Sequence, residues 1–409
     1  MTLFGLIDQT TLGKLEVDLA SKESCCSLIF KNHSQSQPSM SFTIKHQNGR
    51  QRTAIIKTSH GTIQTPCFVP VATQAAAKAL TTAQLSEISS QALMVNAYHA
   101  FLRPGLEVIN KFDGLHNFMG WQKPIMTDSG GFQIFSLGKQ NSAKIQGNKI
   151  TFKSPYDATL QEFTPEKSIQ IQEQLGADII FAFDECIDFN STLDVVQKST
   201  ERTHMWAQES LAAHSRKDQL LYGIVQGGRF KESREHSSEF IGKLGFEGFG
   251  IGSLFGEPKE ESKNVIKWAM SNLPKDKPVH MLGIGQVDDI FYAVEQGGDT
   301  FDCVLATRLA RMGYVFSSDC TSRTKWRYRI TNSQFRLDKK PFDTNCSCWA
   351  CTNHTRAYLY HLFKSNELLA YTLASYHNVA FFHNLMKQIR EAIEQNNLEQ
   401  LKKKWQASL

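Results

Sequence analysis

Short apolar runs rich in β-prone residues recur along the chain from Ser41 onward, and stretches of helical composition separate them. A short apolar run bounded by turn residues is typical of a buried strand. The eight runs are Cys67–Val71, Leu93–Asn96, Pro124–Thr127, Ile179–Phe183, Leu221–Val225, Phe249–Ile251, Val279–Ile284 and Thr300–Leu305. This alternation favours a parallel (β/α)8 barrel over an open sheet, so the predicted fold class is α/β, a TIM barrel.

Helix signals lie between and after these runs. Thr81 with Gln84 forms a possible capping box, and Thr164 followed by proline and glutamate is a favourable helix start. No glycine or proline interrupts the chain after His377. This predicts one long amphipathic helix from Phe381 to Leu401.

Polar residues and glycines follow most of the predicted strands. The segments are Asp128-Ser129-Gly130-Gly131-Phe132-Gln133, Asp184-Glu185-Cys186, Gln226-Gly227-Gly228, Gly252-Ser253-Leu254 and Gly283-Ile284-Gly285, and the last strand carries Asp302. A turn or a helix cap explains each segment taken alone. In a barrel, however, the carboxyl ends of the strands share one face, where catalytic residues gather. Their joint placement therefore predicts a polar site with a closely approachable backbone.

Asp302 is an acid inside an otherwise apolar run. A carboxylate buried there without a partner costs several kcal/mol. One interpretation is structural: Asp302 caps a strand or pairs with Arg308. The other is that Asp302 faces a substrate cation while Arg308 and Arg311 bind an anionic group beside it. The stretch alone leaves both open.

Three of the nine cysteines cluster, at Cys346, Cys348 and Cys351. With His377 they complete a tetrahedral Cys3His set, the pattern of one structural Zn2+ per chain. His354 and His361 are rival fourth ligands, and His354 is the closer rival because it follows Cys351 by three residues. The alternative is three unrelated core cysteines. A closed site would stabilise the fold and take no part in catalysis.

Charge and length add weaker limits. The 409 residues carry a net charge of +5, which is compatible with nucleic acid. No apolar run approaches the roughly 20 residues of a membrane span, and the start is too polar for a secretory signal, so we expect a cytoplasmic protein without a membrane partner. Residues 1–40 form an extension of unknown role, 41–340 the catalytic barrel, and 341–409 the zinc-binding subdomain with C-terminal helices packed on the barrel.

Basic residues precede the cysteine cluster, namely Arg323, Lys325, Arg327, Arg329, Arg336, Lys339 and Lys340. Such a run is usually a solvated face. Here Trp326 and Tyr328 are interleaved with it, so binding to a phosphate backbone is a second interpretation.

These motifs together resemble the tRNA-guanine transglycosylases of the bacterial type. The resemblance rests on 128–133, Phe183–Cys186, Val225–Gly228, Phe301–Val304 and the Cys3His set, and includes Asn96–His99 and Leu102–Gly105. It runs from about Ser41 to the C-terminal helix and does not cover residues 1–40.

The resemblance implies an enzyme of queuosine biosynthesis. Such an enzyme exchanges guanine at the wobble position of a tRNA anticodon for a 7-deazaguanine, preQ1 or queuine, and acts as a homodimer. Asp302 falls on the nucleophile, and Asp128 falls on the general acid/base. The base-binding positions are Asp128, Ser129, Gly130, Gly131, Phe132, Asp184, Gln226, Gly252, Ser253 and Leu282. The RNA-binding positions are Gly283, Ile284, Gly285, Gln286, Val287, Asp288, Asp289, Thr307, Arg308, Leu309, Ala310 and Arg311.

The implied chemistry agrees with the residues. A carboxylate stabilises and traps an oxocarbenium-like ribose, and a second acid assists the leaving base. The base must leave its stack to be read. The chain departs from the family pattern in a Gly252–Glu257 loop one residue shorter, in Ala306 for proline, and in Leu309 and Met312 for asparagine. The choice between preQ1 and queuine and the details of RNA contact stay open.

Two other functions compete with base exchange. A non-catalytic tRNA-binding accessory subunit would keep the fold, although the presence of both Asp128 and Asp302 disfavours it. A metal-dependent barrel hydrolase would need a histidine-rich site at the strand ends, which the sequence lacks.

Overall fold

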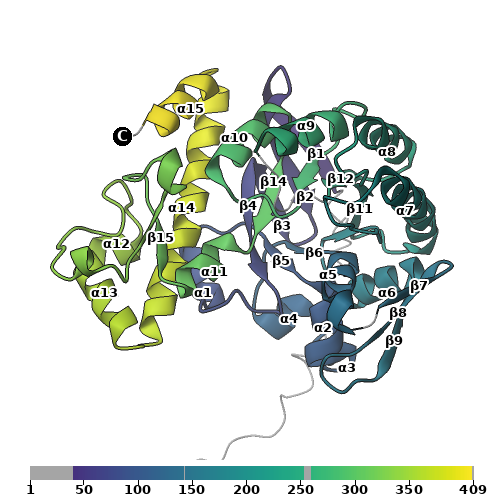
Figure 1. Cartoon of the computed structure of the whole chain (residues 1–409), viewed down its shortest axis with the longest axis horizontal. Helices are drawn as coiled ribbons and strands as arrows, with labels where there is room; N and C mark the ends of the chain where they lie inside the picture. Colours follow the sequence, from purple (N-terminus) through teal and green to yellow (C-terminus); the bar gives the residue numbers. More distant parts are fainter. Residues whose placement is uncertain (1–39, 142, 253–258, 408–409) are drawn as a thin grey trace, which may run out of the picture. The chain divides into compact units, whose positions relative to one another are not determined.

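Eight parallel strands close into a barrel in the computed structural model, which describes residues 40–141, 143–252 and 259–407 (Figure 1). In order around the barrel they are β4 (Cys67–Ala72), β5 (Leu93–Val95), β6 (Ile125–Thr127), β10 (Ile179–Phe181), β11 (Leu220–Val225), β12 (Gly248–Ile251), β13 (Val279–Met281) and β14 (Thr300–Cys303). Each predicted run contains one of these strands or overlaps it, so the predicted (β/α)8 barrel is confirmed.

Helices supply the crossovers that parallel strands require. Those from β4 to the end of the barrel are α1 (Thr82–Glu87), α2 (Ala97–Ala100), α3 (Leu106–Asn110), α4 (Leu115–Met119), α5 (Gly131–Asn141), α6 (Pro165–Leu175), α7 (Leu193–Ala213), α8 (Lys231–Lys243), α9 (Lys259–Ala269), α10 (Val287–Glu295) and α11 (Leu305–Arg311). The predicted starts are confirmed: Thr81 and Gln84 cap α1 reciprocally, and Thr164 accepts from the N–H of Lys167 at α6.

In the described residues, three small antiparallel sheets accompany the barrel. They comprise β1 (Ser41–Asn48), β2 (Gln51–Thr58) and β3 (Gly61–Thr65); β7 (Lys144–Gln146), β8 (Lys149–Lys153) and β9 (Leu160–Phe163); and β15 (Tyr314–Phe316) with β16 (Arg327–Arg329). The first sheet lies against the amino end of the barrel, because Arg52 of β2 bonds to Asp299 just before β14. Its Ile56 and Ile63 join the apolar cluster of strand residues inside the barrel, so this end is closed by packing.

Alternate glycines of β12 make room inside the barrel. A Cβ on Gly248 would come within 2.5 Å of the Tyr222 ring, and one on Gly250 within 3.0 Å of Phe181. Both distances are shorter than normal carbon contacts. These two glycines therefore accommodate large neighbours in the barrel core.

The C-terminal region is helical: α12 (Trp349–Asn353), α13 (Arg356–Lys364), α14 (Leu369–Glu394) and α15 (Leu398–Ala407). The prediction of one helix over Phe381–Leu401 was wrong, since α14 starts earlier and ends at Glu394. Asn396 has φ +56°, and the N–H of Asn397 bonds to Ala392 O at 2.8 Å. Asparagine supplies here the left-handed helix stop that is usually a glycine.

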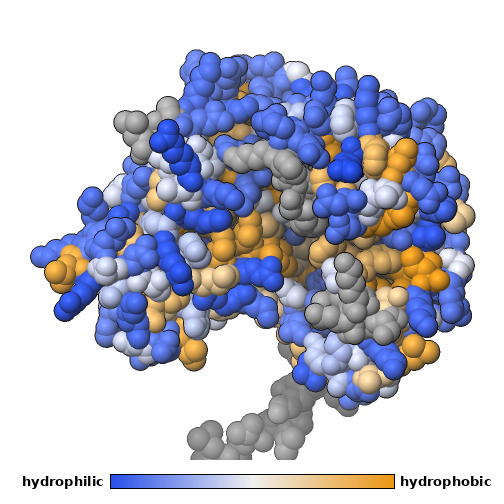
Figure 2. All heavy atoms as spheres, in the orientation of Figure 1, coloured by the Kyte–Doolittle hydropathy of each residue, from blue (hydrophilic) through white to orange (hydrophobic). Residues whose placement is uncertain are grey.

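Among the described helices, none combines the length and the apolar character that a membrane crossing requires. Figure 2 shows hydrophilic residues over most of the visible face and hydrophobic residues in a hollow between the positions of α5 and α11. These two helices follow the carboxyl ends of β6 and β14 along the chain. The hollow is therefore bordered by the segments predicted to carry the chemistry.

Candidate active site and metal centre

Asp128 lies in the turn between β6 and α5, where N–H donors surround its carboxylate. Asn96 and Gln133 donate side-chain amide N–H groups to Oδ2, the latter at 3.3 Å, and the backbone N–H groups of Ala97 and Gly130 reach Oδ1 at 3.0 and 3.2 Å. Burial nevertheless raises the pKa of Asp128 to about 7, and the negative charge of nearby Asp302 adds to the rise. A group that titrates near neutrality is suited to give and take a proton.

Asp184, after β10, forms a second acidic centre with two of the predicted partners. Ser129 Oγ donates to its Oδ1 at 2.9 Å, and Gln226 Nε2 donates to its Oδ2 at 2.7 Å. Burial raises the pKa of Asp184 to about 6, against the lowering effect of these two bonds. The structure thus joins residues from three strand ends into one network.

Glycines allow this network to close. A Cβ on Gly252 would come within 2.5 Å of Gln226 Nε2, and one on Gly131 within 2.5 Å of the Asp184 carbonyl oxygen. Any larger residue at either position would displace its neighbour. The close backbone approach expected from the glycines at the strand ends is found at these two positions.

Asp302 projects from β14 with 15% of its side chain exposed. Its Oδ1 accepts the backbone N–H of Gly283 at 2.8 Å and lies 3.1 Å from His280 Nε2. In the part of the chain that the structure describes, no ion pair or hydrogen bond joins Asp302 to Arg308. The pairing proposed by the structural interpretation is therefore not found, and His280 and Gly283 take that place.

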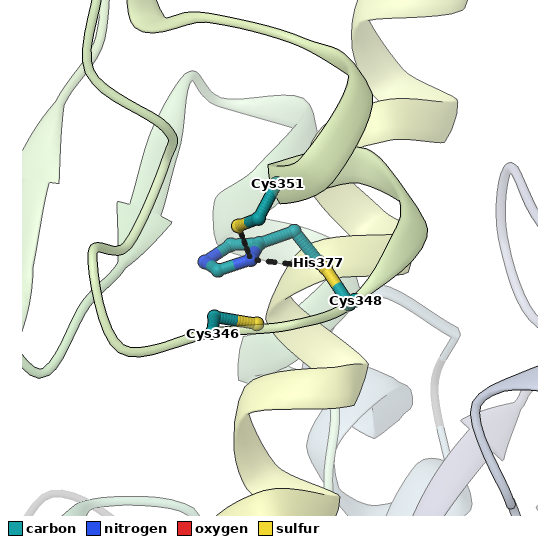
Figure 3. Close-up of side chains that lie close together, drawn as sticks. All are labelled: Cys346, Cys348, Cys351 and His377. Carbon is teal, nitrogen blue, oxygen red and sulfur yellow. Dashed lines mark hydrogen bonds between the residues drawn. The ribbon is translucent and has the colours of Figure 1, made fainter.

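The four residues of the predicted Cys3His set lie together, as the sequence predicted. The ligand atoms of Cys346, Cys348, Cys351 and His377 lie within 4.8 Å of one another, with His377 Nδ1 at 3.6 Å from Cys348 Sγ and 3.2 Å from Cys351 Sγ (Figure 3). Three sulfur donors and one imidazole can hold a metal ion. His354 and His361 do not belong to this group, and the alternative of three unrelated cysteines is not supported.

Helix α14 orients the histidine ligand and its neighbour. His377 Nε2 lies 2.7 Å from the carbonyl oxygen of Phe316, so that Nδ1 is left to face the sulfurs, as in many metal sites. The adjacent Asn378 accepts from the N–H of Phe316 at 2.9 Å and donates to the carbonyl oxygens of Ala306 and Tyr314. Consecutive residues of α14 thus connect the cluster to α11.

Comparisons with known proteins agree with this site. The family model described as queuine tRNA-ribosyltransferase matches residues 47–409. The chain is 45% identical over 363 residues to the queuine tRNA-ribosyltransferase of Halothermothrix orenii, covering 88% of this chain and 95% of that protein. For the Herpetosiphon aurantiacus enzyme of the same name the identity is 44% over 365 residues, covering 89% and 91%. For that of Francisella tularensis it is 40% over 370 residues, covering 90% and 99%.

The chain belongs to the queuine tRNA-ribosyltransferase family. The resemblance inferred from the motifs is confirmed, and the protein is an enzyme of the pentosyltransferase class. The assignment of individual residues to roles remains a prediction.

The segments that the queuine tRNA-ribosyltransferase resemblance assigns to RNA binding differ in exposure. Arg308 is exposed, whereas Ile284, Val287 and Ala310 are buried and can act only through their backbone or by packing. Phe132, a predicted wall of the base pocket, is 41% exposed at the start of α5. Ser253 and most of the shortened Gly252–Glu257 loop lie outside the described residues, as do residues 1–39 of the N-terminal extension.

The aromatic residues among the basic run are part of the fold. Trp326 is 2% exposed, and Tyr328 donates its hydroxyl to the carbonyl oxygen of Phe342 at 2.8 Å. Trp326 therefore offers no free face for a stacked base, and the half-buried Tyr328 ring packs against Phe335 and the Arg356 guanidinium. Any contact of this segment with a phosphate backbone therefore depends on its cations, such as the exposed Arg323 and Arg329.

Sequence reasoning missed three residues of this queuine tRNA-ribosyltransferase site. Asn96 and Gln133 were quoted as parts of motifs without a role, and His280 was counted only as part of a strand. Asn96 and Gln133 lie beside predicted strand ends, a signal that could have indicated contact with Asp128. His280 gave no comparable signal, because its contact with Asp302 depends on the pairing of β13 with β14.

Proposed function

We propose that the protein is a tRNA-guanine transglycosylase that exchanges guanine at the wobble position for a 7-deazaguanine by double displacement. The observation that carries the proposal is the pairing of two differently held acids at one face. Asp302 is partly exposed and can reach a substrate. Burial and the negative charge of Asp302 raise the pKa of Asp128 to about 7. One acid suits attack on a sugar and the other proton transfer to a base.

In the first step, a carboxylate oxygen of Asp302 attacks C1′ of the flipped nucleoside. The bond from C1′ to the ring nitrogen of guanine breaks, its electron pair leaves with the base, and protonated Asp128 supplies the proton that neutralises the leaving ring. The product is a ribosyl-aspartate with an intact RNA backbone. The carboxylate also stabilises the oxocarbenium-like transition state that precedes the new bond.

In the second step, the ring nitrogen of the incoming 7-deazaguanine attacks C1′ on the side opposite to Asp302. The bond between C1′ and Asp302 breaks, which restores the carboxylate, and Asp128 accepts the proton of the incoming base. Two inversions retain the configuration at C1′. Asp184 and Gln226 would read the edge of the base, and Phe132 and Leu282 would stack on its faces.

The remaining assignments rest on the same resemblance. Arg308 and Arg311 would bind phosphates and position the anticodon loop. The Cys3His cluster would hold one structural Zn2+, since it supplies four protein donors and leaves no open position. Among the described residues no cysteine forms a disulfide bond, which fits a reducing cytoplasm.

We also propose a homodimer. Trp349 and Tyr358 are 47% and 38% exposed, and the ring of His354 contacts both, at 5.2 Å between centroids in each case. A row of exposed aromatic side chains is typical of a protein interface. Light scattering of the wild type and of Tyr358→Ala tests this assignment, and a monomeric wild type would refute it.

The experiment that tests the function is incubation with radiolabelled guanine and tRNA that carries guanine at the wobble position. Label should enter the wild type's tRNA product and should be chased by unlabelled preQ1 or queuine, whichever base the enzyme accepts. Wild-type protein that binds tRNA but incorporates no label would instead be the non-catalytic accessory subunit. Competition between preQ1 and queuine for the same tRNA identifies the incoming base.

A further inference from the structure

His280, on β13, is completely buried and contacts two residues of the neighbouring strand β14, Asp302 and Thr300. Its Nε2 lies 3.1 Å from Asp302 Oδ1, and its Nδ1 lies 2.8 Å from Thr300 Oγ1. The pairing of β13 with β14 sets His280 opposite Thr300. The ring packs against Phe181 at 5.3 Å between centroids, and its side chain is 0% exposed.

The hydrogen bonds restrict where the ring carries its proton. A carboxylate that attacks C1′ is ionised and accepts hydrogen bonds only, so the atom facing Asp302 must be an N–H. In a neutral ring, Nδ1 is then an acceptor, and the hydroxyl of Thr300 can donate to it. The ionised carboxylate of Asp302 thus selects the Nε2–H form, and a hydrogen bond donated by Thr300 to Nδ1 stabilises it, as a second group does for histidines in other catalytic sites.

The two hydrogen bonds recorded for Asp302 among the described residues fall on the same oxygen. Gly283 donates its N–H to Oδ1 at 2.8 Å, and His280 Nε2 faces that atom too. Gly283 has φ +74°, a conformation that favours glycine and turns its N–H towards the acid. This arrangement fixes one carboxylate oxygen and leaves Oδ2 to the substrate.

We propose that His280 is a positioning residue for the nucleophile: in its Nε2–H form, which a hydrogen bond from Thr300 stabilises, it anchors Oδ1 of Asp302 together with Gly283 so that Oδ2 attacks the ribose. This inference rests on the proposed function, because it concerns the same ribosyl-aspartate step. The ring itself is buried and does not contact the substrate. It acts through the orientation of Asp302.

The test measures the rate of covalent tRNA–enzyme adduct formation at saturating tRNA, together with tRNA affinity and Tm. His280→Leu removes the donor while keeping an apolar side chain, and should slow adduct formation about 100-fold, the order expected for a misplaced reacting group. His280→Gln restores an N–H donor near the same place and should recover a measurable part of the rate. The affinity for tRNA should stay within about twofold of the wild-type value, because the buried His280 ring does not contact the substrate.

A matched pair of variants at Thr300 tests the hydrogen bond between its hydroxyl and His280 Nδ1. Thr300→Val keeps the shape but loses the hydroxyl, and should slow the adduct step about 10-fold, the value of roughly one hydrogen bond. Thr300→Ser restores the hydroxyl and should recover most of that loss. This pair also decides the question if His280→Leu fails to fold.

The outcomes separate the inference from the function on which it rests. A wild type that forms no adduct refutes the proposed function. If the wild type forms the adduct and both His280→Leu and Thr300→Val form it as fast as the wild type, only the positioning role is refuted. Losses of rate that Gln and Ser fail to recover, accompanied by equal losses of tRNA affinity and Tm, would also overturn it, since that pattern indicates general structural damage.

Discussion

The two ends of the barrel strand β14 hold aspartates in opposite ways. Asp299, just before the strand, is 0% exposed and accepts Arg52 Nε at 3.1 Å and Nη2 at 2.6 Å, with further bonds from Val279 N–H and Thr65. Asp302, three residues later, is 15% exposed and bonds to the backbone N–H of Gly283 and to His280. One strand thus carries a structural acid at its amino end and a candidate nucleophile at its carboxyl end.

A second pair of acids repeats the contrast. Asp178, before β10, contacts His60 and His116 at 2.9 and 3.2 Å, and hydrogen bonds from these rings hold its pKa well below the usual range despite its burial. Asp184, after the same strand, accepts side-chain hydrogen bonds from the neutral Ser129 and Gln226 in the described part of the chain, and burial raises its pKa to about 6. Burial alone therefore does not identify a functional acid. The charge of the hydrogen-bond partners, and an accessible carboxylate oxygen, identify a functional acid better than burial does.

The largest effect should come from Asp302→Asn. We expect adduct formation and guanine exchange to fall by at least about 10⁴-fold, because the nucleophile is removed. The Tm should change by less than about 3 °C, since no buried cation loses its partner. Single-turnover kinetics and thermal melts measure both. An undiminished adduct in Asp302→Asn would assign the nucleophile elsewhere.

Asp299→Asn should lower stability and leave the chemistry of Asp302 in place, the reverse of what we expect for Asp302→Asn. Removing the charge leaves Arg52, which is 4% exposed, buried without its ion-pair partner, and such losses destabilise by roughly 3–5 kcal/mol. Urea unfolding at constant pH measures the change. The double variant Arg52→Met, Asp299→Leu is the control and should be more stable than Asp299→Asn. If Asp299→Asn were as stable as the wild type, the structural role assigned to Asp299 would be wrong.

The partly buried Cys3His cluster extends the comparison, and changing it should affect stability, as at the amino end of β14. Cys348→Ser should lose bound zinc and about 3 kcal/mol of unfolding free energy, a magnitude set by the coupling of metal binding to folding. Elemental analysis and urea unfolding measure both. Cys320→Ser, outside the cluster, should keep the metal. Retention of zinc by Cys348→Ser would mean that another residue serves as a ligand.

The smallest effect is a pH dependence at the carboxyl end. Asp128 must be protonated to assist the leaving guanine, and its pKa is raised to about 7, so adduct formation should fall as pH rises through that value. The decline approaches about tenfold per pH unit above it. Asp128→Asn should react slowly with no such decline. A wild-type rate that stays constant from pH 6 to 9 would contradict this role.

The sequence predicted the barrel because eight short, mainly apolar runs alternate with stretches of helical composition, which is the pattern of a parallel sheet covered by helices. It also predicted that the segments with Ser129, Asp184 and Gln226 lie on one face, since the carboxyl ends of parallel strands share it; the hydrogen bonds among these side chains came from the structure. The three cysteines of the cluster followed from spacing and donor chemistry, whereas the structure decided between His377 and its rivals His354 and His361. These predictions needed only which residues follow which strand.

Contacts that depend on register or on backbone conformation were not predictable in this way. His280 reaches Asp302 only because β13 pairs with β14 in one alignment, and a shift by one residue would turn its ring to the opposite face. The break between α14 and α15 was missed because Asn396 adopts a conformation in which glycine is more common. The residue roles at the barrel mouth remain predictions until they are tested.

The adjacent pair His377 and Asn378 has a consequence for how the enzyme should respond to chelators. Asn378 bonds to the carbonyl oxygen of Ala306, in the helix that begins only three residues after Asp302. Stripping the ion would loosen this turn of α14 and, through it, the backbone next to the nucleophile. Inactivation by a chelator would therefore imitate the loss of a catalytic metal, and only the order of events, with local unfolding before the fall in turnover, would distinguish the two.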